Sequence, residues 1–503
     1  MFTCDEKSGY DHVKLSDNSY KYFGIQFAGW VFVCTTLPFG WKASAYVYQT
    51  IGSCLTSYFR RQGFPCIQYI DDRLHVCPTL DSEETLIEVI RILTSAGYTL
   101  NLNKCQLAPS KRVRYLGFIV DSEKQAYIVP DDKKIAFINL RESILSSSSV
   151  TLHTLQRFAG KCISLNLAVP AAKLYTREVN LAISKCQKNS RCVPLSDDLR
   201  SEIEHWRFLD NWDGCVQWRS EFHHQTYLAT DASAFRYGVS ILSGELKGTS
   251  FGDYWQDGDN RPIHLKEADA LLKAVQSLGE TISNHRLDVL TDNQAVLFSW
   301  QNQGGKNKEL NDIMEKLFNF LFSRNIEMNL KYVPTSLNVA DAPSRCIDMQ
   351  DTKLDHDVWH LIDSLFGPHS VDLMASDSNT MQDKEGQPLK HFTRHPSPLS
   401  AGVNIFSQTL SQEQNPYVFP PFALIFPVLK FLKEQKVKIC TVITPKFNPT
   451  PIWEPFILEY TSYTICIGRK GDKHILCFPS KHGYKKDEHG LKWDLFAHRM
   501  SFL

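Results

Sequence analysis

The stretch "IQYIDDRLHV" (residues 67–76) places Asp71 and Asp72 side by side between two short apolar runs. The flanking apolar residues alternate with others as in a half-buried β-hairpin, and they are Ile67, Tyr69, Leu74 and Val76. The two acids then lie at the bend. One interpretation is a solvated turn, because short polar side chains satisfy turn backbone groups. The other is that a rigid hairpin presents two carboxylates to a metal ion.

Composition limits the class of protein. The chain has 503 residues, 43% of them hydrophobic and 22% charged, which indicates about three globular domains. Its 55 basic and 55 acidic residues cancel, and this argues against a purely electrostatic nucleic-acid binder. The fourteen cysteines include no CxxC pair, so we expect reduced thiols rather than disulfides or zinc.

We expect no signal peptide after Met1 and no transmembrane span, which predicts an intracellular protein of the cytoplasm or nucleus. The most apolar stretch, residues 417–429, is short and rich in proline.

A metal pair would need a further acid from a separate strand. Asp5 ends a short β-prone run, and Gly9 after it permits close backbone approach. Between the two acidic stretches, "TTLPFGWKASAYVYQ" (residues 35–49) reads as a turn that opens a helix of small residues, against which a base pair could lie.

The order of these stretches resembles motifs A to E of the reverse transcriptase palm. The matching segments are residues 5–10, 37–40, 69–72, 101–104 and 115–118, with a predicted helix over 81–97 between the third and fourth. The resemblance implies that Asp5, Asp71 and Asp72 bind Mg²⁺ or Mn²⁺, and that Lys104 is catalytic as proton donor to pyrophosphate.

The same resemblance implies substrate contacts. Tyr10 would exclude a ribose 2′-hydroxyl, and the other expected contacts are Phe39, Gly40, Tyr115, Leu116 and Gly117. The implied partners are an RNA template, a DNA primer, deoxynucleotides and other retroelement proteins. Only four residues precede Asp5, so we expect the fingers region to be missing and polymerisation by this chain to be weak. For Lys104 taken alone, a solvated loop lysine is the alternative.

The middle of the chain turns helical. Residues 130–189 fit the thumb that follows a palm (residues 1–129), and residues 190–224 read as a connection. A second set of acids follows within residues 225–345, at strand ends and in helices: Asp231, Glu267, Asp292 and Asp341. Such acids can converge on a two-metal site for phosphodiester hydrolysis. For each acid taken singly, a helix cap or solvated residue is the alternative.

The order of these four acids resembles ribonuclease H, and "NVADAPSR" (residues 338–345) resembles the retroelement version. The resemblance implies that all four acids are catalytic metal ligands and that the substrate is an RNA–DNA hybrid. No histidine lies between Asp292 and Asp341, where many such nucleases carry one.

Residues 346–503 alternate strands and helices in an α/β rhythm. The spacing resembles the adenine-N6 methyltransferase-like domain of DIRS-type retrotransposons, which use a tyrosine recombinase. Active methylases carry Asn or Asp, two prolines and an aromatic; here residues 419–422 read Phe-Pro-Pro-Phe. Since phenylalanine accepts no hydrogen bond, we expect an inactive domain. A plain α/β module with a structural Pro-Pro turn is the alternative.

The predicted fold class is therefore α+β and α/β multidomain, with a truncated palm and thumb, a ribonuclease H-like domain and a methyltransferase-like domain. The predicted function is RNA-directed DNA polymerase joined to ribonuclease H. Two rivals remain open: a non-catalytic nucleic-acid-binding remnant, and a nuclease whose palm only holds the hybrid.

Overall fold

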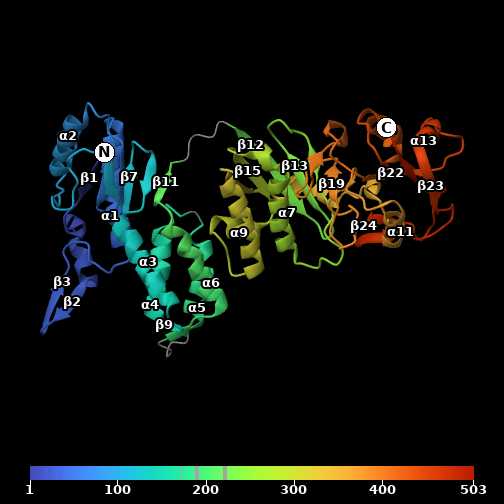
Figure 1. Cartoon of the computed structure of the whole chain (residues 1–503). Coiled ribbons are helices and arrows are strands. Elements are labelled where there is room, and N and C mark those ends of the chain that lie inside the picture. The colour runs from blue at the N-terminus through green and yellow to red at the C-terminus, as the bar shows by residue number, and fades with distance from the viewer. Residues whose placement is uncertain (170, 187–191, 219–223, 503) are drawn as a thin grey trace. The chain divides into compact units, whose positions relative to one another are not determined.

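The computed structural model describes residues 1–169, 171–186, 192–218 and 224–502. The chain divides into two compact units, Met1–Ser220 and Glu221–Leu503 (Figure 1). Helices and strands are mixed in both units. Among the described residues, no helix combines the length and apolar character needed to cross a membrane.

The first unit begins with a three-stranded antiparallel sheet. Its strand order is β1-β5-β4, with β1 at Phe2–Asp5, β4 at Cys66–Tyr69 and β5 at Asp72–His75. Helices α1 (Ser44–Arg61) and α2 (Ser82–Ser95) contribute to the core beneath it. The core residues are Phe2, Cys4, Phe59, Cys66, Val89, Ile92 and Leu93.

The predicted alternation around the acidic turn is wrong. Ile67 and Tyr69 are 53% and 56% exposed, and Val76 is 41% exposed. Residues 73–75 are all buried. Both faces of β5 are covered, because His75 packs against Phe59 on one face and Leu74 packs with Val113 on the other.

Further strands and helices complete this unit. A second antiparallel sheet has the order β11-β8-β7-β6, formed by β6 (Arg112–Tyr115), β7 (Phe118–Asp121), β8 (Ala126–Ile128) and β11 (Cys215–Gln217). Strands β2 (Gly24–Phe27) and β3 (Trp30–Val33) form an exposed hairpin.

Three helices of the segment predicted as the thumb form a bundle with α6 (Asp197–His205), which lies in the segment predicted as a connection. The three are α3 (Asp131–Leu145), α4 (Leu152–Ser164) and α5 (Arg177–Lys185). Strands β9 (Ser149–Thr151) and β10 (Cys192–Pro194) pair beside it. Helix α6 contacts α3 and α5 of the predicted thumb, and β11 pairs with β8 of the predicted palm. Much of the segment predicted as a connection therefore packs on these two parts. Its boundary at 189/190 lies outside the described residues.

The second unit contains a five-stranded sheet of order β14-β13-β12-β15-β16. Its strands are β12 (Gln225–Ala232), β13 (Tyr237–Ile241), β14 (Ser250–Phe251), β15 (Arg286–Thr291) and β16 (Glu327–Tyr332). Strands β12, β15 and β16 run parallel, whereas β13 and β14 complete an antiparallel edge.

Helices cover this sheet. They are α7 (Ile263–Leu278), α8 (Gln294–Gln301), α9 (Lys308–Ser323) and the short α10 (Asp341–Arg345). Tyr237 and Val239 share a core with Leu271 of α7, while Gly238 between them meets the backbone of α10. Since alternate strand residues face opposite sides, α7 and α10 lie on opposite faces.

The rest of this unit is a seven-stranded sheet of order β20-β19-β18-β21-β22-β26-β23. Its strands are β18 (Val371–Asp372), β19 (Lys390–Thr393), β20 (Gly402–Val403), β21 (Pro416–Val418), β22 (Cys440–Pro445), β23 (Thr461–Gly468) and β26 (Leu495–Met500). Strand β26 is antiparallel to both its neighbours, and the first five are mutually parallel.

Three helices and a small sheet accompany this large sheet. The helices are α11 (His356–Phe366), α12 (Ile425–Glu434) and α13 (Glu454–Tyr460). The small sheet contains β17 (Lys353–Leu354), β24 (Leu476–Ser480) and β25 (Gly483–Lys486). The alternation expected after residue 345 is thus present as strands and helices.

Candidate metal-binding carboxylate sites

The acidic turn of the first unit is held tightly. Strands β4 and β5 join through Ile70 and Asp71, with Tyr69 facing Asp72. Ile70 has a φ of 55°, which is uncommon for a β-branched residue. Its amide donates to Gln49 Oε1 at 2.7 Å, and its carbonyl accepts from Gln68 Nε2 at 2.8 Å. These two bonds fix the turn that presents both acids.

The third predicted acid lies directly across the sheet. Asp5 on β1 is the cross-strand partner of Asp72 on β5. Burial, together with the charges of Asp71 and Asp5, raises the pKa of Asp72 to about 6. Lys104 Nζ lies 3.7 Å from Asp5 Oδ2. The structure therefore brings Asp5, Asp72 and Lys104 together beside the turn.

The residues predicted to contact substrate fall into two places. The Tyr10 ring lies 5.0 Å from that of Phe39, which is 83% exposed, and Gly40 follows with a φ of 92°. Leu116 and Gly117 both have positive φ and form the turn between β6 and β7, as a two-residue hairpin of type I′ requires. Tyr115 directs its hydroxyl at the carbonyl of Asp72, at a long 3.5 Å.

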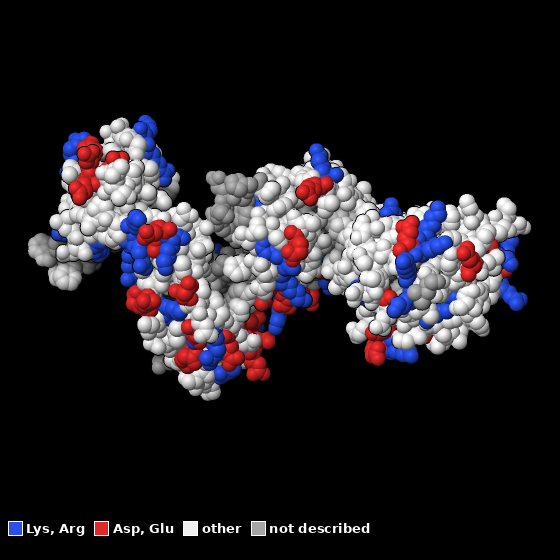
Figure 2. Space-filling view, turned by 45° about the horizontal axis from the view of Figure 1, so that its top comes forward, with Lys and Arg blue, Asp and Glu red and all other residues white. Residues whose placement is uncertain are grey.

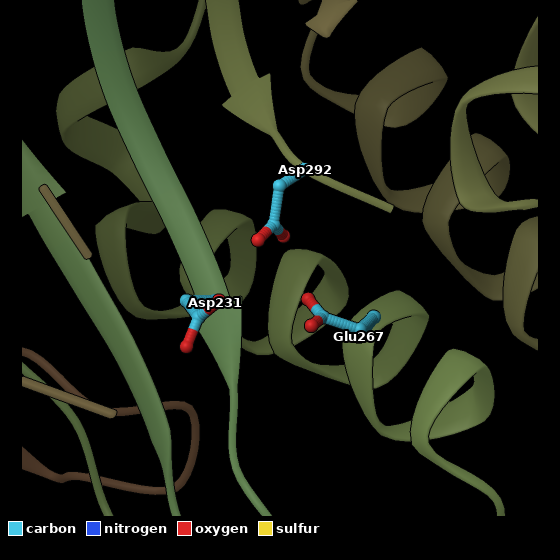
Figure 3. A group of neighbouring side chains, drawn as sticks. All are labelled: Asp231, Glu267 and Asp292. Carbon is cyan, nitrogen blue, oxygen red and sulfur yellow. The ribbon is translucent and has the colours of Figure 1, made fainter. Parts of the chain in front are cut away.

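Three acids of the second unit converge more closely. Asp231 lies near the end of β12, Glu267 on α7 and Asp292 directly after β15, and their side chains point toward one another (Figure 3). One carboxylate oxygen from each lies within 4.8 Å of the other two. Among the described residues, this is the one group of three or more possible metal-ligating side chains that meets this spacing.

The surroundings of these acids are desolvated. Asp231 and Glu267 are 3% and 6% exposed, and Oε2 of Glu267 is buried without a hydrogen-bond partner. Burial raises the pKa of Glu267 to about 9, helped by the charges of Asp231 and Asp292. Burial also raises the pKa of Asp231, against the bond from Ser344 that lowers it. Carboxyl groups this close and this buried resist carrying their charges together.

The segment 338–345 supports the group from one side. Ser344 Oγ donates to Asp231 Oδ2, and Asn338 Nδ2 donates to the carbonyl of Thr230 at 3.0 Å. Asp341, the fourth predicted acid, accepts from Arg345 Nε at 2.7 Å and is not one of the three convergent acids. Sequence reasoning quoted this motif but assigned only Asp341, so it missed Asn338 and Ser344.

Charge on the surface is mixed. On the face shown in Figure 2, basic and acidic side chains are interspersed, in keeping with the formal net charge of zero. Specific carboxylate geometry, rather than an overall field, therefore distinguishes these sites.

A carboxylate at a turn that faces a carboxylate on a neighbouring strand offers the oxygen ligands that divalent cations bind. Residues 1–120 match the family model described as reverse transcriptase (RNA-dependent DNA polymerase), so this part of the chain is a reverse transcriptase domain.

A curated relative extends the similarity further along the chain. An enzymatic polyprotein of Cassava vein mosaic virus is 30% identical over 319 residues, which cover 61% of this chain and 46% of the polyprotein. The chain thus spans less than half the length of this relative.

Solved structures with some similarity include two foamy viral protease–reverse transcriptase complexes. The complex with RNA/DNA hybrid has a TM-score of 0.40 at 16% identity, covering 69% of this chain and 45% of that one. A complex with double-stranded DNA has a TM-score of 0.38 at 17% identity, covering 66% of this chain and 67% of that one.

Proposed function

We propose that this chain is part of a retroelement polyprotein that cleaves the RNA strand of RNA–DNA hybrids at Asp231, Glu267 and Asp292. The observation that carries the proposal is the convergence of these three carboxylates within 4.8 Å, two of them buried. Buried like charges are costly unless a cation offsets them. The substrate follows from the reverse transcriptase domain in the same chain, whose product would be such a hybrid.

The residues present fit a divalent cation. The site offers only carboxylate oxygens, which Mg²⁺ and Mn²⁺ prefer, and Oε2 of Glu267 lacks any other partner. Asp231, Glu267 and Asp292 would hold the cation, with Asp341 as a further ligand once released from Arg345. A bound metal pair supplies activation of water and stabilisation of the leaving oxygen. Ser344 orients Asp231, and Arg345 lies near enough to lower the pKa of Glu267.

The five-stranded sheet supports the assignment to a ribonuclease H-like domain over 225–345. Asp231 and Asp292 lie at the ends of the parallel neighbours β12 and β15, so their carboxylates meet at one edge. Helix α7 then brings Glu267 to the same edge. This is the placement that the resemblance to ribonuclease H implies.

For the first unit, we propose the polymerase palm over 1–129 and the thumb over 130–189. Asp5, Asp71 and Asp72 would bind Mg²⁺ or Mn²⁺, and Lys104 would protonate pyrophosphate. An RNA template, a DNA primer and deoxynucleotides would be the partners, contacted by Tyr10, by residues 39–40 and by residues 115–117. The packing of Tyr10 on Phe39 supports a common surface for the incoming nucleotide.

For residues 346–503, we propose an inactive methyltransferase-like domain of a DIRS-type element. The supporting observation is an α/β sheet with one inserted antiparallel strand, β26. The Phe-Pro-Pro-Phe tetrad follows β21, at the carboxyl end of a parallel strand, where such sheets bind ligands.

The decisive experiment compares Asp292→Asn with the unmodified chain on a labelled RNA–DNA hybrid in Mg²⁺ and in Mn²⁺. The change keeps the shape of the side chain but removes a ligand charge, so cleavage should fall by orders of magnitude while hybrid binding persists. Asp312→Asn, at an exposed acid on α9, removes the same charge elsewhere and should leave cleavage unchanged. Cleavage that survives Asp292→Asn, or is absent from the unmodified chain, would favour the non-catalytic binding protein.

A further inference from the structure

A buried ion pair lies directly behind the acids of the palm. Glu6 follows Asp5 in the chain, and Arg73 follows Asp72. Arg73 Nε lies 2.6 Å from Glu6 Oε1, and both side chains are fully buried. Since successive strand residues face opposite sides of a sheet, the ion pair lies on the face opposite the facing acids Asp5 and Asp72.

Helix α1 completes a network around the pair. Tyr48 donates its hydroxyl to Glu6 Oε2, and Arg73 Nη1 donates to Thr56 Oγ1 at 2.9 Å. Two glycines make room for it. A Cβ at Gly9 would lie 2.8 Å from the Tyr48 ring, and a Cβ at Gly52 would lie 1.9 Å from Gln68 Nε2. The network therefore joins β1, β5 and α1 at close range.

The two faces of this strand pair have opposite electrostatics. On one face Asp5 and Asp72 are direct cross-strand neighbours of like charge, an arrangement that pushes strands apart. On the other face the opposite charges of Glu6 and Arg73 draw the same two strands together. The Glu6 amide also donates to the Asp71 carbonyl at 3.0 Å, so β1 is tied to the turn itself.

We propose that Glu6 and Arg73 are positioning residues that hold Asp5 and Asp72 at the separation a divalent cation requires. The inference rests on the metal site proposed for the palm. Stability alone does not account for the pair, because well-packed apolar residues replace buried ion pairs at little or no cost. An apolar pair would not provide a charge-assisted hydrogen bond of fixed direction between the two strands, as Arg73 and Glu6 do.

The test uses the full chain carrying Glu267→Gln and Asp292→Asn, which remove the other carboxylate site. Binding of Mn²⁺ is measured by electron paramagnetic resonance, and folding by thermal unfolding. The double change Glu6→Met with Arg73→Met should weaken Mn²⁺ binding about tenfold or more, as loss of groups that orient metal ligands does. It should lower the unfolding midpoint modestly, because the buried hydroxyl of Tyr48 loses its acceptor.

A matched control is available in the thumb helices. Arg141 is also fully buried and binds Asp210 at 2.8 Å, but it contacts none of the palm acids. Arg141→Met should lower the unfolding midpoint and leave Mn²⁺ binding unchanged. If it weakens Mn²⁺ binding as much as the Glu6 and Arg73 change does, the effect is general destabilisation and the positioning role is excluded.

Two further arms separate the possible failures. If Asp5→Asn with Asp72→Asn leaves Mn²⁺ binding intact in the same background, the palm holds no metal and both proposals for it fail. If those changes abolish binding but the folded Glu6 and Arg73 double variant binds normally, only the positioning role is overturned. Should the double variant not fold, Tyr48→Phe removes one donor to Glu6. It should still weaken Mn²⁺ binding severalfold, and unchanged binding would overturn the inference.

Discussion

Ile70 stores backbone strain at the turn that presents Asp71 and Asp72. Its φ of 55° lies in the left-handed region, which costs a residue with a Cβ roughly 1–2 kcal/mol. Ile70→Gly should therefore raise the free energy of unfolding of the first unit by about 1 kcal/mol, measured by urea unfolding. Ile67→Gly, at an exposed strand position of the same hairpin, should lower it instead. A less stable Ile70→Gly variant would show that packing of the isoleucine side chain outweighs the strain.

At the same scale, the sequence predicted the acidic residues of the two sites better than it predicted the residues that position those acids. Asp5 and Asp72 are cross-strand partners, and Asp231, Glu267 and Asp292 converge, because acids at strand ends are visible as patterns. The bond from Ser344 and the pair of Glu6 with Arg73 depend on which side chains meet after folding. A buried Glu or Arg looks like any surface charge in a sequence, so these partners needed the structure.

At the scale of elements, α10 depends on a missing side chain in β13. A Cβ at Gly238 would lie 2.3 Å from the Ser344 amide and 2.8 Å from the Ala340 carbonyl. Gly238→Ala should displace α10, lower the free energy of unfolding by about 1–3 kcal/mol, and reduce hybrid cleavage because Ser344 no longer holds Asp231. Thermal unfolding and the cleavage assay measure the two effects. Gly305→Ala, where a Cβ meets nothing within 4 Å, should change neither.

Helix α5 begins against a carboxylate from α6, and this contact makes its stability depend on pH. Glu202 accepts from the amides of Glu178 and Val179 at 2.8 and 2.9 Å. Burial is the main cause that raises the pKa of Glu202 to about 7 from 4.5. The folded state thus keeps a proton that the unfolded chain has lost, so the free energy of unfolding should fall as pH rises from 4.5 to 7 and level off above.

The measurement is urea unfolding across that pH range. Glu202→Gln cannot ionise and should flatten this part of the pH dependence, whereas Glu204→Gln at an exposed position of α6 should not. An unchanged pH profile in Glu202→Gln would show that another group is responsible.

At the scale of the whole chain, the two sheets of the second unit are joined by buried polar contacts. Asp253, just after β14, is 4% exposed and accepts from the Ser378 amide at 3.0 Å and from Ser376 Oγ at 3.2 Å. The Asp348 amide donates to the Tyr254 hydroxyl at 3.0 Å. The α/β rhythm after residue 345 was visible in the sequence, but contacts between segments this far apart were not.

The tetrad at residues 419–422 yields a prediction about the whole chain, that it transfers no methyl group to DNA. Transfer to an adenine amine needs a hydrogen-bond acceptor, and Phe419 offers none. Phe422 instead packs edge-on against Trp493 and Phe447, at 4.9 and 5.6 Å between ring centres. With a labelled methyl donor and adenine-containing DNA, the full chain should incorporate no label above background, while an active adenine methylase supplies the positive control. Incorporation that Phe419→Ala or Phe422→Ala abolishes would make this tetrad part of a working site and refute the assignment of an inactive domain.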